Sequence, residues 1–397
     1  MVTLPGSAVG AEAEVLRGQL ARFMRRHPEI RVVQRRTPDA ADQRHQLYVQ
    51  WLNAWSHDPD VLQLDVVWTP EFAAAGWVLP LDRFEPDSDF FPATLAANTW
   101  RGRLYALPWF VDVGMLYWRT DLLAEPPARF EALLSAAAAA QREGRVEYGW
   151  VLQAARYEGL VTVFVELLGA HGGRILDENG DVVVDAPAAV RALEALHGAL
   201  GERGGVPREA LTWQEEQTRF AFQNGRALFM RNWPYAWPLM QRAAESRVAG
   251  RFAVAPLPAA AGGQPSATLG GSQLAINARS DHPEAAWKVI AFLTHPDQMR
   301  ERARLVGQYP PRPSLYEGET LRGVLPVPPD EARRLVESAV PRPATPVYTQ
   351  LSGILQIHLH RALSGQAEPA AALAAAAREM RRLLARTGLA PRRAGRG

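Results

Sequence analysis

Two kinds of apolar pattern alternate near the N-terminus, and this alternation constrains the fold more than any other feature of the chain. Leu16, Leu20 and Phe23 recur at helical spacing and are followed by the strand-like run 30–33. A second helical segment at about 41–55 precedes the apolar run 62–68. Strands that alternate with helices form a mostly parallel sheet covered by helices on both faces. The expected fold class is therefore α/β.

The same alternation starts again further along the chain and predicts a second lobe. Helical segments at about 128–142 and 158–168 flank the strand-like run 148–152. Between the two parts, the segment 104–118 is dense in apolar and aromatic residues and is interrupted by Pro108 and Asp112. A single strand is not expected to continue across a proline. We interpret this segment as a crossing from one lobe to the other.

An aromatic segment at 231–237 is the most distinctive candidate site. Trp233, Tyr235 and Trp237 follow a strand-like run and precede a helical one. Aromatic rings at such a turn can leave the core and line a cleft, where they stack on a ligand and offer polar tips. The alternative is that all three rings belong to the core. A ring-faced cleft would suit a polyhydroxylated ring such as a sugar.

Polar residues elsewhere supply further candidates. Asp65 falls near the end of an apolar strand, where ligands bind in α/β sheets, or it caps the next helix. Asp112 lies in an apolar run and needs a partner or a cavity, because an unpaired buried carboxylate is costly. Gly270 and Gly271 would let a backbone approach a ligand closely. Arg342 stands between two prolines and is either a ligand donor or a surface charge; in isolation the surface is favoured.

Composition excludes several classes of function. The 397 residues and 47% hydrophobic content suit two or three folded domains. There is no cysteine, which excludes disulfides, thiol catalysis and cysteine metal sites. A formal net charge of +2 does not suggest nucleic-acid binding. The C-terminal arginines, which include Arg392, Arg393 and Arg396, are interpreted as a solvated helix face with a frayed tail rather than a binding arm. Because no run is long and apolar enough for a membrane span, the chain is expected to be soluble.

Signatures of catalysis are also missing. The nine histidines form no metal-ligand constellation, and neither a nucleophile elbow nor a dinucleotide fingerprint occurs. We therefore expect no metal and no cofactor. Carboxylates beside aromatic rings could still serve a glycosidase, which needs two carboxylates flanking one bond. A glycoside-acting enzyme is the alternative to a binding protein at this point.

Several stretches, taken together and in order, resemble a known family. The resemblance is to the sugar-binding proteins of bacterial and archaeal ABC importers, nearest to the trehalose/maltose-binding branch, and it runs from about residue 7 to residue 385. The matching segments are 58–68, 75–82, 104–108, 222–225, 231–237, 267–271 and 340–343.

This resemblance implies a two-lobed periplasmic-binding-protein fold of type II, similar to cluster D, with a ligand cleft between lobes joined by a hinge of several crossings. The expected division is 1–109 plus 271–310 for the N-terminal lobe and 110–270 plus 311–397 for the C-terminal lobe. The implied protein is not an enzyme. It is a monomeric receptor, periplasmic or on the extracellular face of the cytoplasmic membrane. It captures an α-linked disaccharide such as trehalose, maltose or a sucrose-like glucoside and delivers it to the membrane permease of an ABC transporter. Nucleic acid is not expected among its partners.

The resemblance also implies a set of ligand-binding residues. Asp65, Asp112 and Arg342 correspond to hydroxyl-binding side chains, and Gly270 and Gly271 to backbone contacts. The aromatic positions are Trp233 and Phe110, with Tyr235 beside them, and further polar matches are Glu215, Arg44 and Glu12. Two positions depart from the family pattern. Phe110 stands where relatives have Tyr, and Ser272 stands where they have Trp, so the sugar and its linkage are left open.

Overall fold

The computed structural model describes residues 1–6, 11–38, 40–201 and 204–390, and its chain forms two compact units. The first comprises 1–113, 233–242 and 269–346, and the second comprises 114–232, 243–268 and 347–397. These units place 110–113, 233–242, 269–270 and 311–346 in the first unit, whereas the expected division assigned them to the second lobe. Arg392, Arg393 and Arg396 lie outside the described residues.

The first unit is built around a three-stranded sheet with the order β3-β11-β6. The strands are β3 (Val61–Asp65), β11 (Leu269–Ile276) and β6 (Ala106–Val113), and β11 is antiparallel to both neighbours. A separate parallel pair joins β1 (Val2–Gly6) to β2 (Val32–Arg36). The expectation of a mostly parallel sheet is therefore wrong here. The central strand is supplied by a segment distant in sequence, and alternation predicts parallel pairing only between consecutive strands.

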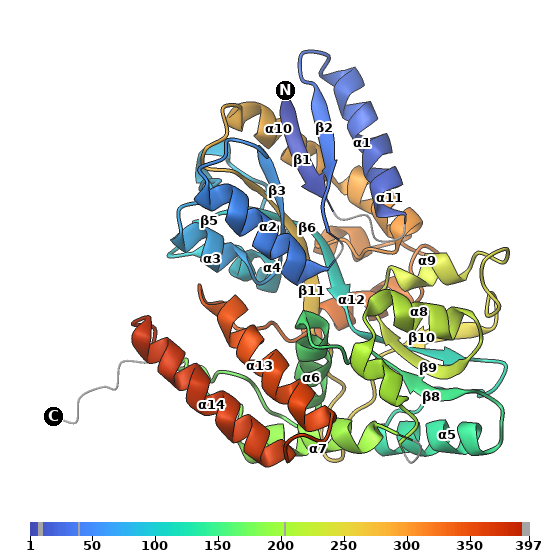
Figure 1. The fold of residues 1–397 in the computed structure, drawn as a ribbon. Coiled ribbons are helices and arrows are strands. Elements are labelled where there is room, and N and C mark those ends of the chain that lie inside the picture. The colour runs from blue at the N-terminus through green and yellow to red at the C-terminus, as the bar shows by residue number, and fades with distance from the viewer. Residues whose placement is uncertain (7–10, 39, 202–203, 391–397) are drawn as a thin grey trace. The chain divides into compact units, whose positions relative to one another are not determined.

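Helices of the first unit cover these strands. Helix α1 (Glu12–Arg26) buries Leu16, Leu20 and Phe23, as the spacing predicted, and packs on α10 (Pro283–Leu293) and α11 (Pro296–Val306). In Figure 1, α1 runs alongside β2, and the contacts between the two confirm this. The other helices of the unit are α2 (Ala41–Asn53), α3 (Thr69–Ala74), α4 (Pro92–Ala97), α9 (Ala236–Met240) and α12 (Pro329–Ser338).

Strand β6 continues across Pro108, contrary to the sequence expectation. Its pairing with β11 shifts register at this point: Ser272 faces Phe110 and Gln273 faces Pro108, so Trp109 is the extra residue. A bulge tolerates proline because the ladder bond that proline cannot donate is already interrupted there. The expected crossing does follow, because the first segment of the first unit ends at Val113 and β7 (Met115–Arg119) belongs to the second unit.

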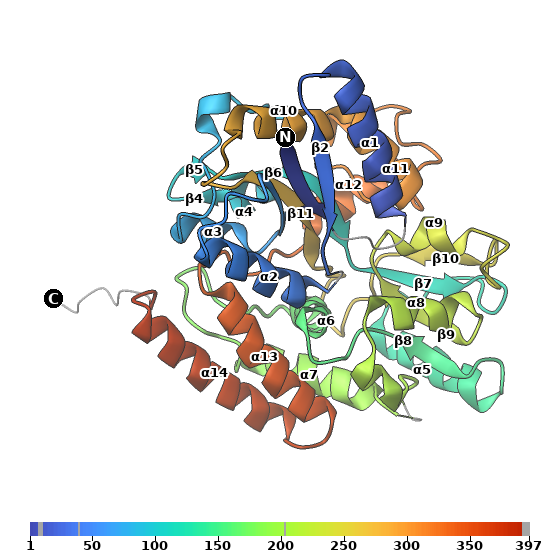
Figure 2. The same ribbon diagram turned by 45° about the horizontal axis from the view of Figure 1, so that its top comes forward.

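The second unit contains a four-stranded sheet with the order β10-β7-β9-β8. Only β8 (Tyr148–Val151) and β9 (Ala227–Asn232) are parallel; β7 is antiparallel to β9 and to β10 (Phe252–Ala255). Helix α6 (Glu158–Ala170) is almost wholly buried, and α13 (Tyr348–Leu363) packs on it. Helices α13 and α14 (Pro369–Arg386) lie side by side in Figure 1 and Figure 2. The remaining helices are α5 (Phe130–Arg142), α7 (Pro187–Ala199) and α8 (Glu215–Gln223).

Candidate functional site

The sheet of the first unit brings together residues that the sequence places far apart. Ser272 on the central strand β11 pairs with Asp65 of β3 on one side and with Phe110 of β6 on the other. Two positions earlier on β11, Gly270 pairs with Asp112. Neighbouring strands lie about 4.8 Å apart. Asp65, Ser272 and Phe110 occupy one row across the three strands, and the pair Gly270 and Asp112 forms the next row on the same face of the sheet.

Asp65 and Arg342 form an ion pair at this sheet. The Arg342 Nη2 lies 3.4 Å from Asp65 Oδ1 and 3.4 Å from the carbonyl oxygen of Leu269. The Arg342 side chain is only 2% exposed, against 17% for Asp65. The interpretation of Arg342 as a surface charge is thus wrong. Asp65 also does not cap the next helix, because α3 is preceded by Trp68 at its N-cap position.

Trp233 lies against the glycine of the neighbouring row. A methyl group added at Gly270 would lie 3.3 Å from Cζ3 of Trp233 and 3.4 Å from Cβ of Asp112. The indole thus approaches the strand where the side chain is missing, next to a carboxylate-bearing residue. Trp233 is half-buried, whereas Tyr235 is buried. The interpretation of all three rings as core therefore fails for Trp233 and Trp237, which are both half-buried.

Gly271 is required by its backbone. Its φ of +118° lies in the region that only glycine adopts readily. A Cβ at this position would lie 2.2 Å from the carbonyl oxygen of Phe110, which no side chain could accommodate. The two glycines are therefore needed for different reasons: Gly271 allows the close strand pairing, and Gly270 leaves room for the Trp233 ring.

The other predicted residues are distributed more widely. Glu12 begins α1, is buried, and accepts a hydrogen bond of 2.9 Å from Arg302. Arg44 on α2 donates to the carbonyl of Pro38 and lies with its guanidinium 5.4 Å from the Trp68 ring centroid. Glu215 belongs to the second unit, where its carbonyl accepts from Asn232 of β9. The β11 cluster is accordingly Asp65, Phe110, Asp112, Trp233, Gly270, Gly271 and Arg342.

Sequence reasoning missed a buried cation near this cluster. The Arg302 guanidinium lies 3.9 Å from the Trp109 ring centroid and 5.5 Å from that of Phe110. Burial lowers the pKa of Arg302, and the nearby charge of Glu12 opposes this effect. By contrast, burial raises the pKa of Tyr309, whose charged form is the deprotonated one. No pattern in the sequence indicated Arg302, since it stands in the charged run 300–304, which is typical of a solvated helix face.

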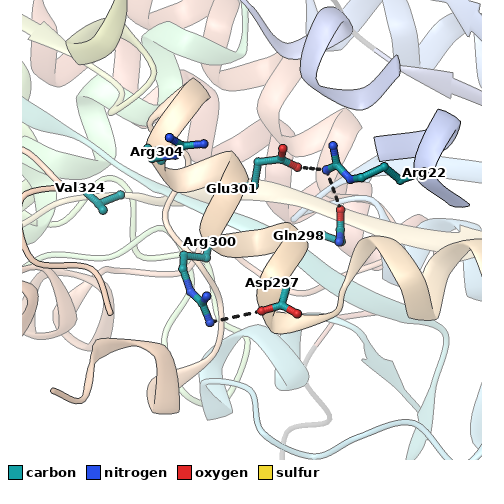
Figure 3. A pocket seen from close by; sticks show the side chains of 7 residues that line it. All are labelled: Arg22, Asp297, Gln298, Arg300, Glu301, Arg304 and Val324. Carbon is teal, nitrogen blue, oxygen red and sulfur yellow. Dashed lines mark hydrogen bonds and ion pairs between the residues drawn. The ribbon is translucent and has the colours of Figure 1, made fainter. Parts of the chain in front are cut away.

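A pocket of about 320 Å³ also opens in the first unit, between α11, Arg22 of α1 and Val324 (Figure 3). Four of its charged groups pair with one another: Arg22 pairs with Glu301, and Arg300 lies 3.3 Å from Asp297. None of the predicted ligand-binding residues lines it, and it offers no aromatic face. The pocket is therefore a poor fit for a sugar, and the β11 cluster is the better candidate.

Within residues 1–6, 11–38, 40–201 and 204–390, two other kinds of feature are absent. No group of three or more His, Asp or Glu side chains in that part of the chain is placed to hold a metal ion. Within the same residues, no helix combines the length and the apolar character that crossing a bilayer requires.

Comparison with known proteins identifies the family. The model of the bacterial extracellular solute-binding proteins matches residues 10–300. A probable ABC transporter-binding protein of Deinococcus radiodurans is 36% identical over 360 residues, 87% of this chain and 84% of the relative. Among solved structures, maltose-bound MalE3 of T. maritima shares 40% identity and a TM-score of 0.92, covering 96% of this chain and 99% of that one.

A solved structure of lower sequence identity has the same fold. The GacH receptor of Streptomyces glaucescens is 25% identical with a TM-score of 0.85, and it covers 97% of this chain and 98% of its own. The expected two-lobed α/β fold class of periplasmic binding proteins is thereby confirmed, and the relatives are solute-binding proteins rather than enzymes. The chain belongs to the family of bacterial extracellular solute-binding proteins.

Proposed function

We propose that this protein is the sugar-binding receptor of an ABC importer and that its ligand is an α-linked disaccharide of the maltose or trehalose type. MalE3, at 40% identity, is described with bound maltose, and the GacH receptor with acarbose. Other similar structures hold α-D-tagatose or ribitol, so fold similarity does not fix the ligand. The proposal extends to delivery of the sugar to a membrane permease from the periplasmic or extracellular side.

The observation that carries this proposal is the β11 cluster. It combines carboxylates of Asp65 and Asp112, the guanidinium of Arg342 and the half-buried indole of Trp233. Carboxylates accept hydrogen bonds from sugar hydroxyls, and arginine donates to hydroxyl and ring oxygens in a fixed fork. An indole face packs on the C–H face of a pyranose. We propose these four residues, with Phe110, Tyr235, Gly270, Gly271, Glu12, Arg44 and Glu215, as the ligand-binding set.

The free energies of these contacts are sufficient for the affinity of a transport receptor. A hydrogen bond to a charged group contributes about 1.5 to 3 kcal/mol when well formed. A micromolar complex needs about 8 kcal/mol. Two carboxylates, one arginine and one stacking ring therefore reach that range, and no covalent bond of the sugar has to break. Ser272, a small residue between Asp65 and Phe110, would leave space for a differently linked glucoside.

Calorimetric titration with maltose, trehalose, sucrose and ribitol tests this proposal. We expect at least one disaccharide to bind, and Trp233→Ala and Asp65→Ala each to weaken that binding at least about tenfold, the equivalent of one lost contact of about 1.4 kcal/mol. Trp287→Ala is the matched control, because Trp287 is also half-buried in the first unit but stacks on Phe84. Unchanged affinity in both site variants would refute the assignment of the site. Release of free glucose in proportion to protein concentration would refute a purely binding role.

A further inference from the structure

Arg302 is enclosed within the first unit by groups from three separate segments. Its side chain is 1% exposed, although it belongs to the charged helix α11. Its Nη2 donates to Glu12 Oε1 at 2.9 Å, and its Nε donates to Gln308 Oε1 at 2.9 Å. Gln308 Nε2 in turn lies 3.4 Å from the same oxygen of Glu12. The three side chains close a hydrogen-bonded triangle.

Aromatic rings cover the guanidinium on another side. Its carbon lies 3.9 Å from the centroid of Trp109 and 5.5 Å from that of Phe110, both on β6. A cation so placed is attracted by the ring and restrains the orientation of that ring. Tyr309, directly after Gln308, exchanges two backbone hydrogen bonds with Val111 of the same strand. Arg302 therefore connects the start of α1 to the segment of β6 that carries Phe110 and Asp112.

Burying a guanidinium costs several kcal/mol unless partners replace its water. The Glu12 carboxylate, the Gln308 amide and the Trp109 ring provide part of that replacement. Such a group contributes little net stability compared with an apolar side chain of similar volume. Its clearest physical effect is geometric, because one rigid planar fork holds the glutamate carboxylate through Nη2 and the Gln308 amide oxygen through Nε.

We propose that Arg302 is a positioning residue of the sugar site: it does not touch the ligand but holds the Glu12 carboxylate and the Phe110 ring in their binding orientation. This inference rests on the proposed function, in which Glu12 and Phe110 contact the sugar. The enclosure of the guanidinium means that it acts through these neighbours. A glutamate has three rotatable side-chain bonds, and ordering them before binding removes an entropic cost from the binding step.

A double-mutant cycle on affinity tests the inference. The affinity for maltose or trehalose, whichever binds the unmodified protein more tightly, is measured for Arg302→Met, Glu12→Gln and the double variant. We expect Arg302→Met to weaken binding about tenfold in the otherwise unchanged protein, within the range found for coupled neighbours. In the Glu12→Gln background the same change should weaken binding less than about threefold, because the carboxylate that Arg302 positions is already absent.

Arg312→Met is the matched control. Arg312 is also buried in the first unit, pairs with Asp87 at 2.6 Å, and lies 4.3 Å from the Phe90 ring centroid. It should lower thermal stability and leave affinity unchanged. If Arg302→Met does not fold, Arg302→Lys replaces it: lysine keeps the charge but not the fork, and about a threefold loss of affinity is expected.

The outcomes separate the two proposals. Failure of the unmodified protein to bind any sugar refutes the proposed function and the inference with it. If the unmodified protein binds sugar, equal losses from Arg302→Met with and without Glu12→Gln show that Arg302 does not act through Glu12. Unchanged affinity in a folded Arg302 variant also overturns the inference. Both results leave the sugar-binding function in place.

Discussion

At the scale of single residues, the two adjacent glycines of β11 are needed for different reasons. Gly271 is needed for its backbone conformation, and Gly270 for the space that its missing side chain leaves. Gly271 has a φ of +118° and no room for a Cβ, whereas Gly270 lies in an ordinary strand conformation and a methyl group there would only press on the Trp233 ring and Asp112, at 3.3 and 3.4 Å. The same substitution at neighbouring positions should therefore have different effects on stability and binding.

We expect Gly271→Ala to lower the free energy of unfolding by at least about 2 kcal/mol, because the alanine is strained in this conformation and its methyl group meets the Phe110 carbonyl. Gly270→Ala should change it by about 1 kcal/mol or less, yet weaken sugar binding, because the Trp233 ring must move. Urea unfolding and calorimetric titration of both variants measure the two quantities. Equal free energies of unfolding in the two variants would contradict the different roles given to Gly271 and Gly270.

At the scale of elements, helix α6 organises the second unit through one buried carboxylate. Glu166 accepts from Nε of Arg231 at 2.9 Å, and the Arg231 Nη1 donates to Gln153 at 3.1 Å. The side chains of the pair are 5% and 1% exposed. A Cβ at Gly114 would lie 1.9 Å from Glu166 Oε1, so the carboxylate fills the space that this glycine leaves. Helix α6 thus holds the start of β7 and the end of β9 in place.

We expect Glu166→Gln to lower the free energy of unfolding by about 3 to 5 kcal/mol, because it leaves the Arg231 charge buried without its counter-ion. Replacing both Glu166 and Arg231 by Met should cost less than the single change. Glu178→Gln, which removes an exposed pair with Arg174, is the control and should shift stability by less than about 1 kcal/mol. Urea unfolding measures all three; a double variant less stable than the single one would be the contrary result.

At the scale of the whole molecule, acid sensitivity follows from carboxylates paired with arginine. A hydrogen bond from Arg119 lowers the pKa of Asp121, and one from Arg226 lowers the pKa of Glu147. A backbone hydrogen bond and Arg312 lower the pKa of Asp87. Each group therefore binds its proton less readily in the folded protein than in the unfolded chain.

The sign of the pH dependence follows directly. The stabilisation is fully present above the ordinary values, 3.8 for Asp and 4.5 for Glu, and is lost as the pH falls through the lowered pKa values. We expect the melting temperature to be steady above about pH 5 and to fall steadily below about pH 4. Asp121→Asn should make the fall shallower. Scanning calorimetry across this range measures it, and a melting temperature that rises on acidification would be inconsistent with these pairs.

The sequence by itself determined the α/β class, the helical faces such as Leu16, Leu20 and Phe23, and the family resemblance, because periodicity and motifs are local properties of the chain. It did not predict that β11 enters between β3 and β6, that β6 continues across Pro108, or that Arg342 is buried. Those features depend on segments more than a hundred residues apart in sequence. The role of Arg302 is of the same kind: a charged helix turn becomes a buried cation only when α1 and β6 pack around it, and packing is decided by tertiary structure.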